Sequence, residues 1–406
     1  MTDHNHSAPD LGSLYLGKDT ASKLSTLFGV VGVVGTLAAV GALFSAELRT
    51  QALHSYLVGF FYMITIALGG LFFTVLQHLA VARWSVVVRR LSESMASTLP
   101  VVVLLFLPLA FTVAGGDHSL FGWTDPHIHD PAVQAKHAYL NVPFFLVRAT
   151  IYLVVWGMLG TIFYRRSLAL DKSGDPFIIV GLRRFSGPAM VLFGFSLTFA
   201  AFDWTMSLAP TWYSTIYGVY IFAGAVTSSL STMILLGLLL RRAGLLTNVI
   251  TIEHYHDLGK LLFGFIVFWT YIAFSQYFLI WYANIPEETE WFGHRWHGSW
   301  VIVSVGLALL HFAVPFFSLL SRHAKRSPTM LALVASLMLV MHYVDMYWLV
   351  MPKLHPEGAT PHWLDVAAVV GTVGIFLAVL VRRLGSAPLI PAKDPFLQAS
   401  MEFENV

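Results

Sequence analysis

Ten long runs of mostly apolar residues constrain this chain more than any other feature of its sequence. A helix needs about 20 such residues to cross the apolar core of a bilayer, and each run has at least 18. The runs are too long for barrel strands, and a helix satisfies its own backbone polar groups inside lipid. The sequence therefore predicts an all-α integral membrane protein with ten transmembrane helices. The predicted spans are 25–45, 55–80, 98–115, 142–164, 185–208, 212–240, 259–282, 299–320, 329–351 and 364–381.

The composition agrees with a chain whose main solvent is lipid. Only 11% of the 406 residues are charged, whereas a soluble domain has about 25%. The net charge of +2 is too small to indicate nucleic-acid binding. The chain has no cysteine, which excludes disulfides, thiolate nucleophiles, cysteine-ligated iron–sulfur clusters and covalent c-type haem. We therefore expect this chain to bind no redox cofactor of its own.

The distribution of lysine and arginine predicts the orientation of the spans. With the N-terminus inside, 19 of the 24 basic residues fall on the inner side and 5 on the outer side, in line with the positive-inside rule. Both termini are thus expected to be cytoplasmic. The first span carries Gly29, Gly32 and Gly35, a spacing that favours close contact with another helix.

Ionisable side chains inside the spans are the main candidates for function, because lipid does not tolerate them unless they face the protein interior or water. At about 1.5 Å of rise per residue, His311 and His342 come to mid-membrane. Asp345 and Asp203 fall in the outer third, and His78 lies near the inner end of its span. A cluster at the inner surface contains Glu253, His256, Asp257 and Lys260.

Titratable groups at the inner surface, the middle and the outer third are what a proton path needs, and histidine can pass protons near neutral pH. The alternative is that these groups form hydrogen-bonded pairs that hold the helices together. For His78 packing is favoured, and Arg148 near an outer helix end favours an ion pair or an interface. A haem between His311 and His342 is disfavoured, because sequential helices pack only about 8–10 Å apart. The outer loop 117–137 has metal-capable side chains but no ligand spacing typical of a metal site, so we expect no metal.

A weak internal repeat suggests how the spans are grouped. Asp203 precedes Pro210 by seven residues, and Asp345 precedes Pro352 by the same spacing, four spans later. This predicts two four-helix bundles of like orientation, formed by spans 2–5 and 6–9, with spans 1 and 10 peripheral. The corresponding segments are a cytoplasmic tail 1–24, span 1 with its outer loop 25–54, a first bundle 55–211, a second bundle 212–352, an outer loop with span 10 at 353–383, and a cytoplasmic tail 384–406.

Five stretches resemble a known family. They are YLNVPFFLVR at 139–148, FDWTMSL at 202–208, STIYG at 214–218, HDLGKLL at 256–262 and AFSQYFLIWYANIPEE at 273–288. Together they resemble the F subunits (ActF) of bacterial alternative complex III, which belong to the wider NrfD/polysulfide-reductase-like family of membrane subunits. The similarity runs from about the second span to the C-terminus and is most specific in the last of these stretches.

The resemblance implies a multi-pass subunit in a bacterial cytoplasmic membrane, within a respiratory complex that oxidises quinol. Its expected partners are the paralogous NrfD-like quinol subunit, an iron–sulfur subunit and c-type cytochrome subunits, with membrane lipid around them and a cytochrome c or terminal oxidase as acceptor. The haem c and the iron–sulfur clusters would be in those partners. The chain is then expected to be a scaffold that conducts protons and is not catalytic alone.

Two alternatives remain from the sequence. This subunit could itself bind quinol or quinone at the outer face, with Asp203 or His137 accepting the quinol proton and Arg148 nearby, because a general base must lie within hydrogen-bond reach of that hydroxyl. It could also be an independent proton-coupled transporter, although the family resemblance argues against this reading.

Overall fold

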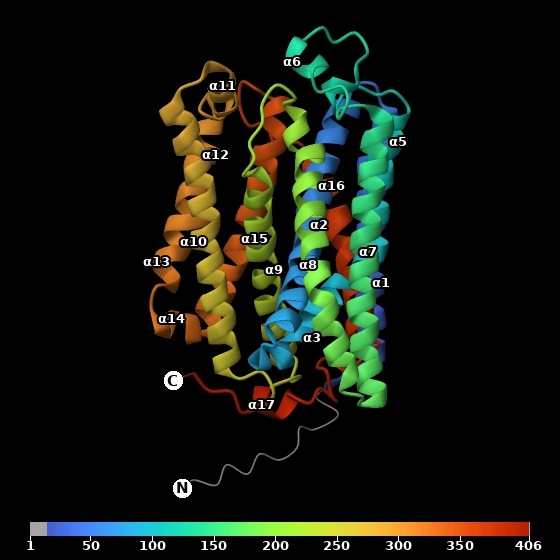
Figure 1. Ribbon diagram of the computed structural model, residues 1–406, viewed down its shortest axis with the longest axis vertical. Helices are drawn as coiled ribbons and strands as arrows, with labels where there is room; N and C mark the ends of the chain where they lie inside the picture. Colours follow the sequence, from blue (N-terminus) through green and yellow to red (C-terminus); the bar gives the residue numbers. More distant parts are fainter. Residues whose placement is uncertain (1–13, 406) are drawn as a thin grey trace.

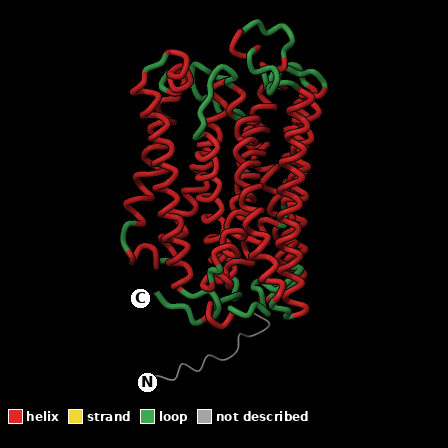
Figure 2. Tube along the Cα trace, viewed as in Figure 1, coloured by secondary structure: helices red, strands yellow, loops and turns green. Residues whose placement is uncertain are grey.

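The chain is built from helices that run side by side along one axis (Figures 1 and 2). The computed structural model describes residues 14–405, so the first 13 residues of the predicted N-terminal tail lie outside it. Helix accounts for 78% of the structure, and the described residues contain no strand. Ten helical segments are long and apolar enough to cross a membrane. These segments overlap the ten predicted spans, so the all-α multi-pass architecture is confirmed. They are Lys18–Phe44, Arg49–Ala80, Arg83–Ala114, Val142–Ser173, Phe177–Leu208, Tyr217–Arg242, Ile252–Ala283, Trp300–Leu319, Pro328–Lys353 and Trp363–Leu384.

The α-helices follow in chain order, with short 3₁₀ or π segments between some of them. In the first half they are α1 (Lys18–Gly41), α2 (Arg49–Ala80), α3 (Val86–Ala96), α4 (Leu99–Val102), α5 (Leu107–Ala114), α6 (Pro131–Gln134), α7 (Val142–Ser173) and α8 (Phe177–Trp204). In the second half they are α9 (Tyr217–Arg242), α10 (Ile252–Ala283), α11 (Pro286–Arg295), α12 (Trp300–Gly306), α13 (Val314–Leu319), α14 (Arg322–Arg326), α15 (Pro328–Val350), α16 (Trp363–Leu384) and α17 (Leu397–Met401). The π segment η7 (Leu307–Ala313) joins α12 to α13, and the 3₁₀ turns η6 (Met206–Leu208) and η8 (Met351–Lys353) follow α8 and α15.

Several helices extend beyond their predicted spans, for example α8, which begins at Phe177 and not at 185. The third and sixth spans also begin elsewhere than predicted. The third span was predicted to begin at 98, but its helix begins a turn or more earlier, in α3, which buries Arg89, Arg90 and Glu93. Those charges had made the segment look like a loop. The same span is broken into α3, α4 and α5, and Pro100 and Pro108 each occupy the first turn of a new piece, because proline cannot continue the preceding hydrogen-bond ladder. The sixth span was predicted to begin at 212, whereas α9 begins at Tyr217.

Helix α2 forms the centre of the molecule. Its apolar window is entirely buried, and it contacts α3, α8, α9, α15 and α16. Helix α9 contacts α2, α8, α10 and α15. By contrast, α1 packs mainly against α16 and leaves most of its surface exposed. The large apolar side chains on the outer surfaces of α1, α7, α8, α10 and α12 are what a lipid-facing surface requires.

Glycines allow α1 and α16 to touch backbone to backbone. A Cβ added to Gly35 would lie 2.7 Å from the amide nitrogen of Gly371, and one added to Gly32 would lie 2.5 Å from the nitrogen of Ile375. The predicted close contact is thus confirmed for Gly32 and Gly35. Gly29 contributes less, since its added Cβ would meet Ala378 at an ordinary 3.7 Å.

The two ends of the bundle differ in charge. The basic helix α14 lies at the same end of the bundle as α17, and this end is called the basic end (Figure 1). Helices α6 and α11 lie at the opposite end, which is called the distal end. The C-terminal segment 385–405 folds back under the basic end as a strap. Its Ser400 hydroxyl donates to the carbonyl of Trp84, its Asp394 pairs with Arg89, and the backbone amide of Leu389 donates to the carbonyl of Leu14.

The contact between α1 and α16 makes the effect of a single methyl group predictable. We expect Gly35→Ala to lower the stability by about 1–3 kcal/mol, as an overpacked interface does. Gly41→Ala is the matched control, because nothing lies within 4 Å of its added Cβ. Thermal unfolding in detergent, followed by tryptophan fluorescence, measures both. Equal midpoints for the two variants would contradict the packing described here.

Candidate functional site

A buried polar cluster lies in the middle of the second half of the chain, where α9, α10, η7 and α15 meet. His342 and Asp345 stand three residues apart on α15, hence on the same face, and at most 1% of either residue is exposed. The hydroxyl of Tyr220 on α9 donates to Oδ1 of Asp345. The indole of Trp269 on α10 lies beside the same carboxylate. Within residues 14–405, no lysine or arginine pairs with Asp345, and its Oδ2 has no hydrogen-bond partner.

His311 joins this cluster from a distorted stretch of helix. It lies in the π segment η7, four residues before Pro315. Proline has no amide hydrogen to give to the carbonyl four residues earlier, so the regular ladder fails at this place. The imidazole is fully buried and stacks on Trp269, with ring centroids 3.8 Å apart. Neither of its ring nitrogens has a hydrogen-bond partner among the described residues.

His342 is tied to the central helices on its other side. Its Nε2 lies 2.8 Å from the Thr65 hydroxyl of α2. A Cβ on Gly224 of α9 would lie 3.2 Å from the same imidazole, so this glycine provides room for the ring. The structure therefore brings His311, His342 and Asp345 together, as their predicted depths suggested. The Nε2 of His342 is occupied by the Thr65 hydroxyl, while Trp269 stacks on His311.

Asp203 and Arg148 form a different kind of site. Arg148 Nε and Nη2 donate to the two oxygens of Asp203 at 2.8 and 2.9 Å, and the Tyr152 hydroxyl donates to Oδ2 at 2.9 Å. Such a two-point contact satisfies both charges. The ion pair foreseen for Arg148 is present. His137 is exposed and has no side-chain contact with this pair, so the three residues proposed for quinone do not converge.

The residues predicted as the inner surface cluster gather at the start of α10. Lys260 Nζ lies 2.5 Å from Asp257 Oδ1, and Glu253 pairs with Arg326 of α14. His256 is buried and its Nδ1 has no partner among the described residues. Asn405 of the C-terminal strap accepts from Lys260 and donates to the carbonyl of Glu253. The strap thus covers this cluster, a contact that the sequence did not predict.

The two clusters on α10 are far apart. Trp269 follows Asp257 by 12 positions, which is about 18 Å along the helix.

Between these levels, α9 presents a row of buried hydroxyl groups. The sequence analysis missed this row, although its signal was present as polar residues within an apolar span. The Ser229 hydroxyl has no partner among residues 14–405, and neither does that of Tyr255 on α10. The row consists of Thr227, Ser228, Ser229 and Ser231.

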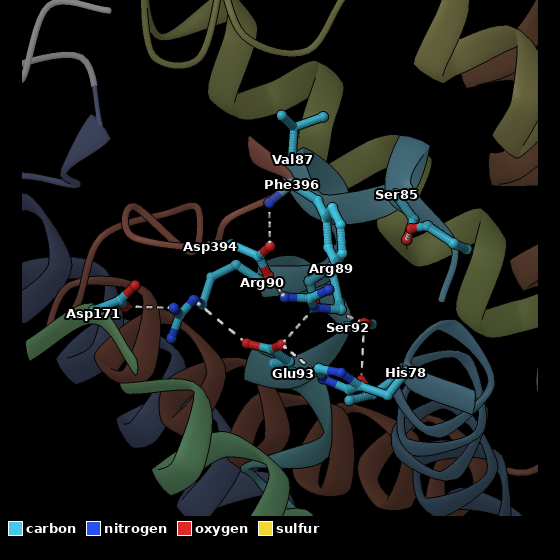
Figure 3. Close-up of polar contacts among 12 residues, drawn as sticks. His78, Ser85, Val87, Arg89, Arg90, Ser92, Glu93, Asp171, Asp394 and Phe396 are labelled. Atoms are coloured by element: carbon cyan, nitrogen blue, oxygen red, sulfur yellow. Dashed lines mark hydrogen bonds and ion pairs between the residues drawn. The ribbon is translucent and has the colours of Figure 1, made fainter. Parts of the chain in front are cut away.

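His78 belongs to a third cluster, at the basic end of the first half (Figure 3). Its Nε2 lies 3.8 Å from Oε1 of Glu93, which also accepts from Arg89 at 3.0 Å. Arg89 reaches Asp394 of the strap at 2.5 Å. A second guanidinium, that of Arg90, pairs with Asp171 at 2.5 Å and lies 3.5 Å from Glu93. Three carboxylates therefore face two guanidinium groups and one histidine.

Apart from His78, the sequence analysis missed this network. Its signal was the spacing of Arg89, Arg90 and Glu93, which places both arginines within one turn of the glutamate on a helix. The network fastens α3 to α2, to α7 and to the strap, and its members are buried except Asp171, which is partly buried. It explains how a charged segment can lie inside the bundle.

The chain was compared with known proteins, and no family model and no curated protein matches it.

The Arg148–Asp203 pair allows a test of its structural role. We expect Asp203→Asn to destabilise the protein by about 3–5 kcal/mol, because it leaves a buried guanidinium without its counter-charge. The double variant Arg148→Met with Asp203→Leu should recover much of that loss. Thermal unfolding in lipid nanodiscs measures both, with Glu290→Gln as an exposed control at the same end. A double variant as unstable as the single one would argue that the pair does not act as a unit.

Proposed function

We propose that this chain is a membrane subunit of a quinol-oxidising respiratory complex of the alternative complex III type, in a bacterial cytoplasmic membrane, and that it conducts protons without a redox cofactor of its own. The resemblance of five sequence stretches supports the choice of complex, and the ten membrane-spanning segments are compatible with it. The proposed partners are the paralogous quinol subunit, the iron–sulfur subunit and the c-type cytochromes, with a cytochrome c or terminal oxidase as acceptor.

The observation that carries proton conduction is the buried cluster around Asp345. A carboxylate that accepts a hydrogen bond from a tyrosine hydroxyl but pairs with no cation can take up and release a proton without breaking an ion pair. His311 beside it has two ring nitrogens without partners among the described residues. The π segment that holds His311 is a feature found frequently at functional sites.

We propose that protons enter at the basic end, near Glu253, His256, Asp257 and Lys260, and pass the hydroxyl row of α9 to the central cluster. The positive-inside rule supports assigning the basic end to the cytoplasm. Asp203 has its acceptors occupied by Arg148 and Tyr152, and His78 is held by the Glu93 network. Both are therefore assigned to packing and not to the path.

The proposed grouping into two four-helix bundles accords with the contacts of the central helices. Helix α2 contacts α3 and α8 of its own proposed bundle, and α9 contacts α10 and α15 of the other. The direct contact of α2 with α9 would then join the two bundles.

A paired variant tests conduction directly. In the purified complex, reconstituted into vesicles, we expect Asp345→Asn with His342→Leu to abolish most proton translocation while quinol oxidation continues. The reason is that each of the two substitutions removes a group that can carry a proton but leaves the side-chain volume nearly unchanged. Proton movement is read with a pH-sensitive dye and turnover by reduction of the electron acceptor.

The matched control is His54→Leu, which removes another buried histidine, at the distal end of α2 and with its Nδ1 near the Thr50 carbonyl. This control should translocate protons normally. If the paired variant also pumps as well as the wild type, conduction through Asp345 is refuted.

Quinone binding is a second candidate function, favoured by one cavity. A cavity of about 630 Å³ opens between α10 and α12 toward the apolar surface. Its wall includes Tyr220 and Trp269 of the central cluster, together with Gln276 and several aromatic rings. An isoprenoid quinone could reach this cavity from the lipid, whereas the residues suggested by the sequence, Asp203, Arg148 and His137, offer no comparable space.

Filling the cavity tests this candidate. Ala273→Trp places an indole against its wall, and we expect it to suppress labelling of this chain by a photoreactive quinone at least several-fold. Val191→Trp, on the exposed surface of α8, is the control and should label like the wild type. Labelling that is confined to the paralogous subunit in every sample would exclude a quinone site here.

A further inference from the structure

Arg295 is a buried cation that no carboxylate neutralises. Only 4% of the residue is exposed. Its Nη1 and Nη2 donate to the carbonyls of Trp291 and Leu349, at 2.8 and 3.0 Å. Its Nε has no partner, and no carboxylate within residues 14–405 forms an ion pair with it. The guanidinium carbon lies 3.3 Å from the centre of the Trp291 ring and 4.8 Å from that of Trp348.

The guanidinium keeps its charge in spite of this burial. Burial lowers the pKa of Arg295 to about 9, so the group is protonated at pH 7. Placing a full charge in such surroundings is costly. A cation held in this way by carbonyls and aromatic faces calls for a reason beyond packing.

Arg295 stands directly distal to the central cluster. The carbonyl that it bonds belongs to Leu349, one turn after Asp345 on α15, which is about 6 Å farther along the axis. Tyr217 and Tyr220 of α9 lie near enough to act on its charge. Tyr220 is also the residue that donates to Asp345. The carbonyl that accepts from the guanidinium is thus one helical turn from Asp345 along α15.

On its other side, Arg295 lines a cavity of about 420 Å³ at the distal end. Thr205, Trp212 and Leu349 line the same cavity, and Trp212 stacks on Trp291 with ring centroids 4.3 Å apart. The cavity wall also carries titratable side chains from α11, from η8 and from the residue that caps α6. They are Asp130, Glu287, Glu290, His294 and Lys353.

We infer that Arg295 is a positioning residue for proton release, which sits between Asp345 and this distal cavity and favours the ionised form of Asp345. The inference rests on the proposed function. The oxygen–hydrogen bond of the Asp345 carboxyl breaks, the proton passes to water in the cavity, and the carboxylate remains behind under the field of the guanidinium. No electron is transferred in this step. A nearby opposite charge favours the charged form of a carboxyl group.

Titratable groups lie around Asp345 and Arg295 on the elements packed against them, and those shown to act on the charge of Arg295 are Tyr217 and Tyr220. Helix α9 contributes two tyrosines, α15 and η7 contribute the two histidines of the cluster, and the cavity wall contributes the charges named above. The full set is Tyr217, Tyr220, His311, His342, Asp130, Glu287, Glu290, His294 and Lys353. Only Arg295 combines burial with a charge fixed over the working pH range.

The experiment measures proton release against external pH, using the whole complex in vesicles. For Arg295→Gln we expect the midpoint of release to move to more alkaline pH by about one unit, a tenfold change in proton affinity. Arg295→Lys should return the midpoint to near its wild-type position. Lys353→Gln removes an exposed cation from the same cavity and should move it far less. A purely structural role for Arg295 would lower the amplitude or the turnover without moving the midpoint.

A second variant keeps the test informative if Arg295→Gln does not assemble. The chain has no cysteine, so Thr205→Cys places one thiol of this subunit in the cavity wall. Modification by a methanethiosulfonate that carries a sulfonate should move the midpoint to alkaline pH, and one that carries a trimethylammonium should move it the other way. Mass spectrometry of this chain confirms the modification.

The outcomes separate the two proposals. The role of Arg295 is supported if the midpoint of proton release moves to alkaline pH when positive charge is lost or negative charge is added, and to acidic pH when positive charge is added. An unchanged midpoint in every variant, with translocation still lost in the paired Asp345→Asn, His342→Leu variant, overturns the role of Arg295 and leaves proton conduction standing. Normal translocation in the paired variant overturns conduction, and the role of Arg295 with it.

Discussion

The chemistry proposed for this protein depends on how Asp203 and Asp345, the two fully buried aspartates among the described residues, are neutralised. Asp203 and Asp345 have the same spacing to a proline, the same place near the distal end of a helix, and a tyrosine hydroxyl that donates to each. Arg148 reaches Asp203 from the neighbouring helix and saturates both of its oxygens. Among residues 14–405 no such arginine pairs with Asp345. Because a charge inside the membrane must be compensated, Asp203 is a fixed structural pair, and this difference is the reason why proton exchange is proposed for Asp345 alone.

The backbone around Asp345 is shaped to admit this arrangement. Pro315 interrupts the hydrogen bonds of the eighth span at His311, and the resulting π segment presents the imidazole to Trp269. Gly224 leaves room on α9 for the ring of His342. Both irregularities cost helix stability, and both occur beside the same cluster. Proline breaks and close glycine contacts also occur elsewhere in the bundle, but the π segment is the only one among residues 14–405, and it holds a histidine of this cluster.

The sequence predicted much of this architecture, and the reasons for its failures are physical. Long apolar runs identified every span, since lipid imposes the same length on all of them. Depth along the helices placed His311, His342 and Asp345 at neighbouring levels. The sequence could not show which faces meet, because lipid-facing and protein-facing surfaces are equally apolar. It therefore missed the pairing partners of Glu93 in α3, the burial of Arg295, and the folding of the strap under the bundle.

The strap also links the two acidic clusters of the basic end. Asp394 closes the network of Arg89 and Glu93, while Asn405 contacts Lys260 and the backbone of Glu253. Asn405 follows Asp394 by eleven positions. Between them, the Ser400 hydroxyl donates to the carbonyl of Trp84, and the Ser400 carbonyl bonds to Nε2 of His254. Because one short segment satisfies polar groups in both halves of the molecule, neither cluster can be completed unless the segment is in place. The proposed site of proton uptake thus includes residues from the end of the sequence, which follow α16.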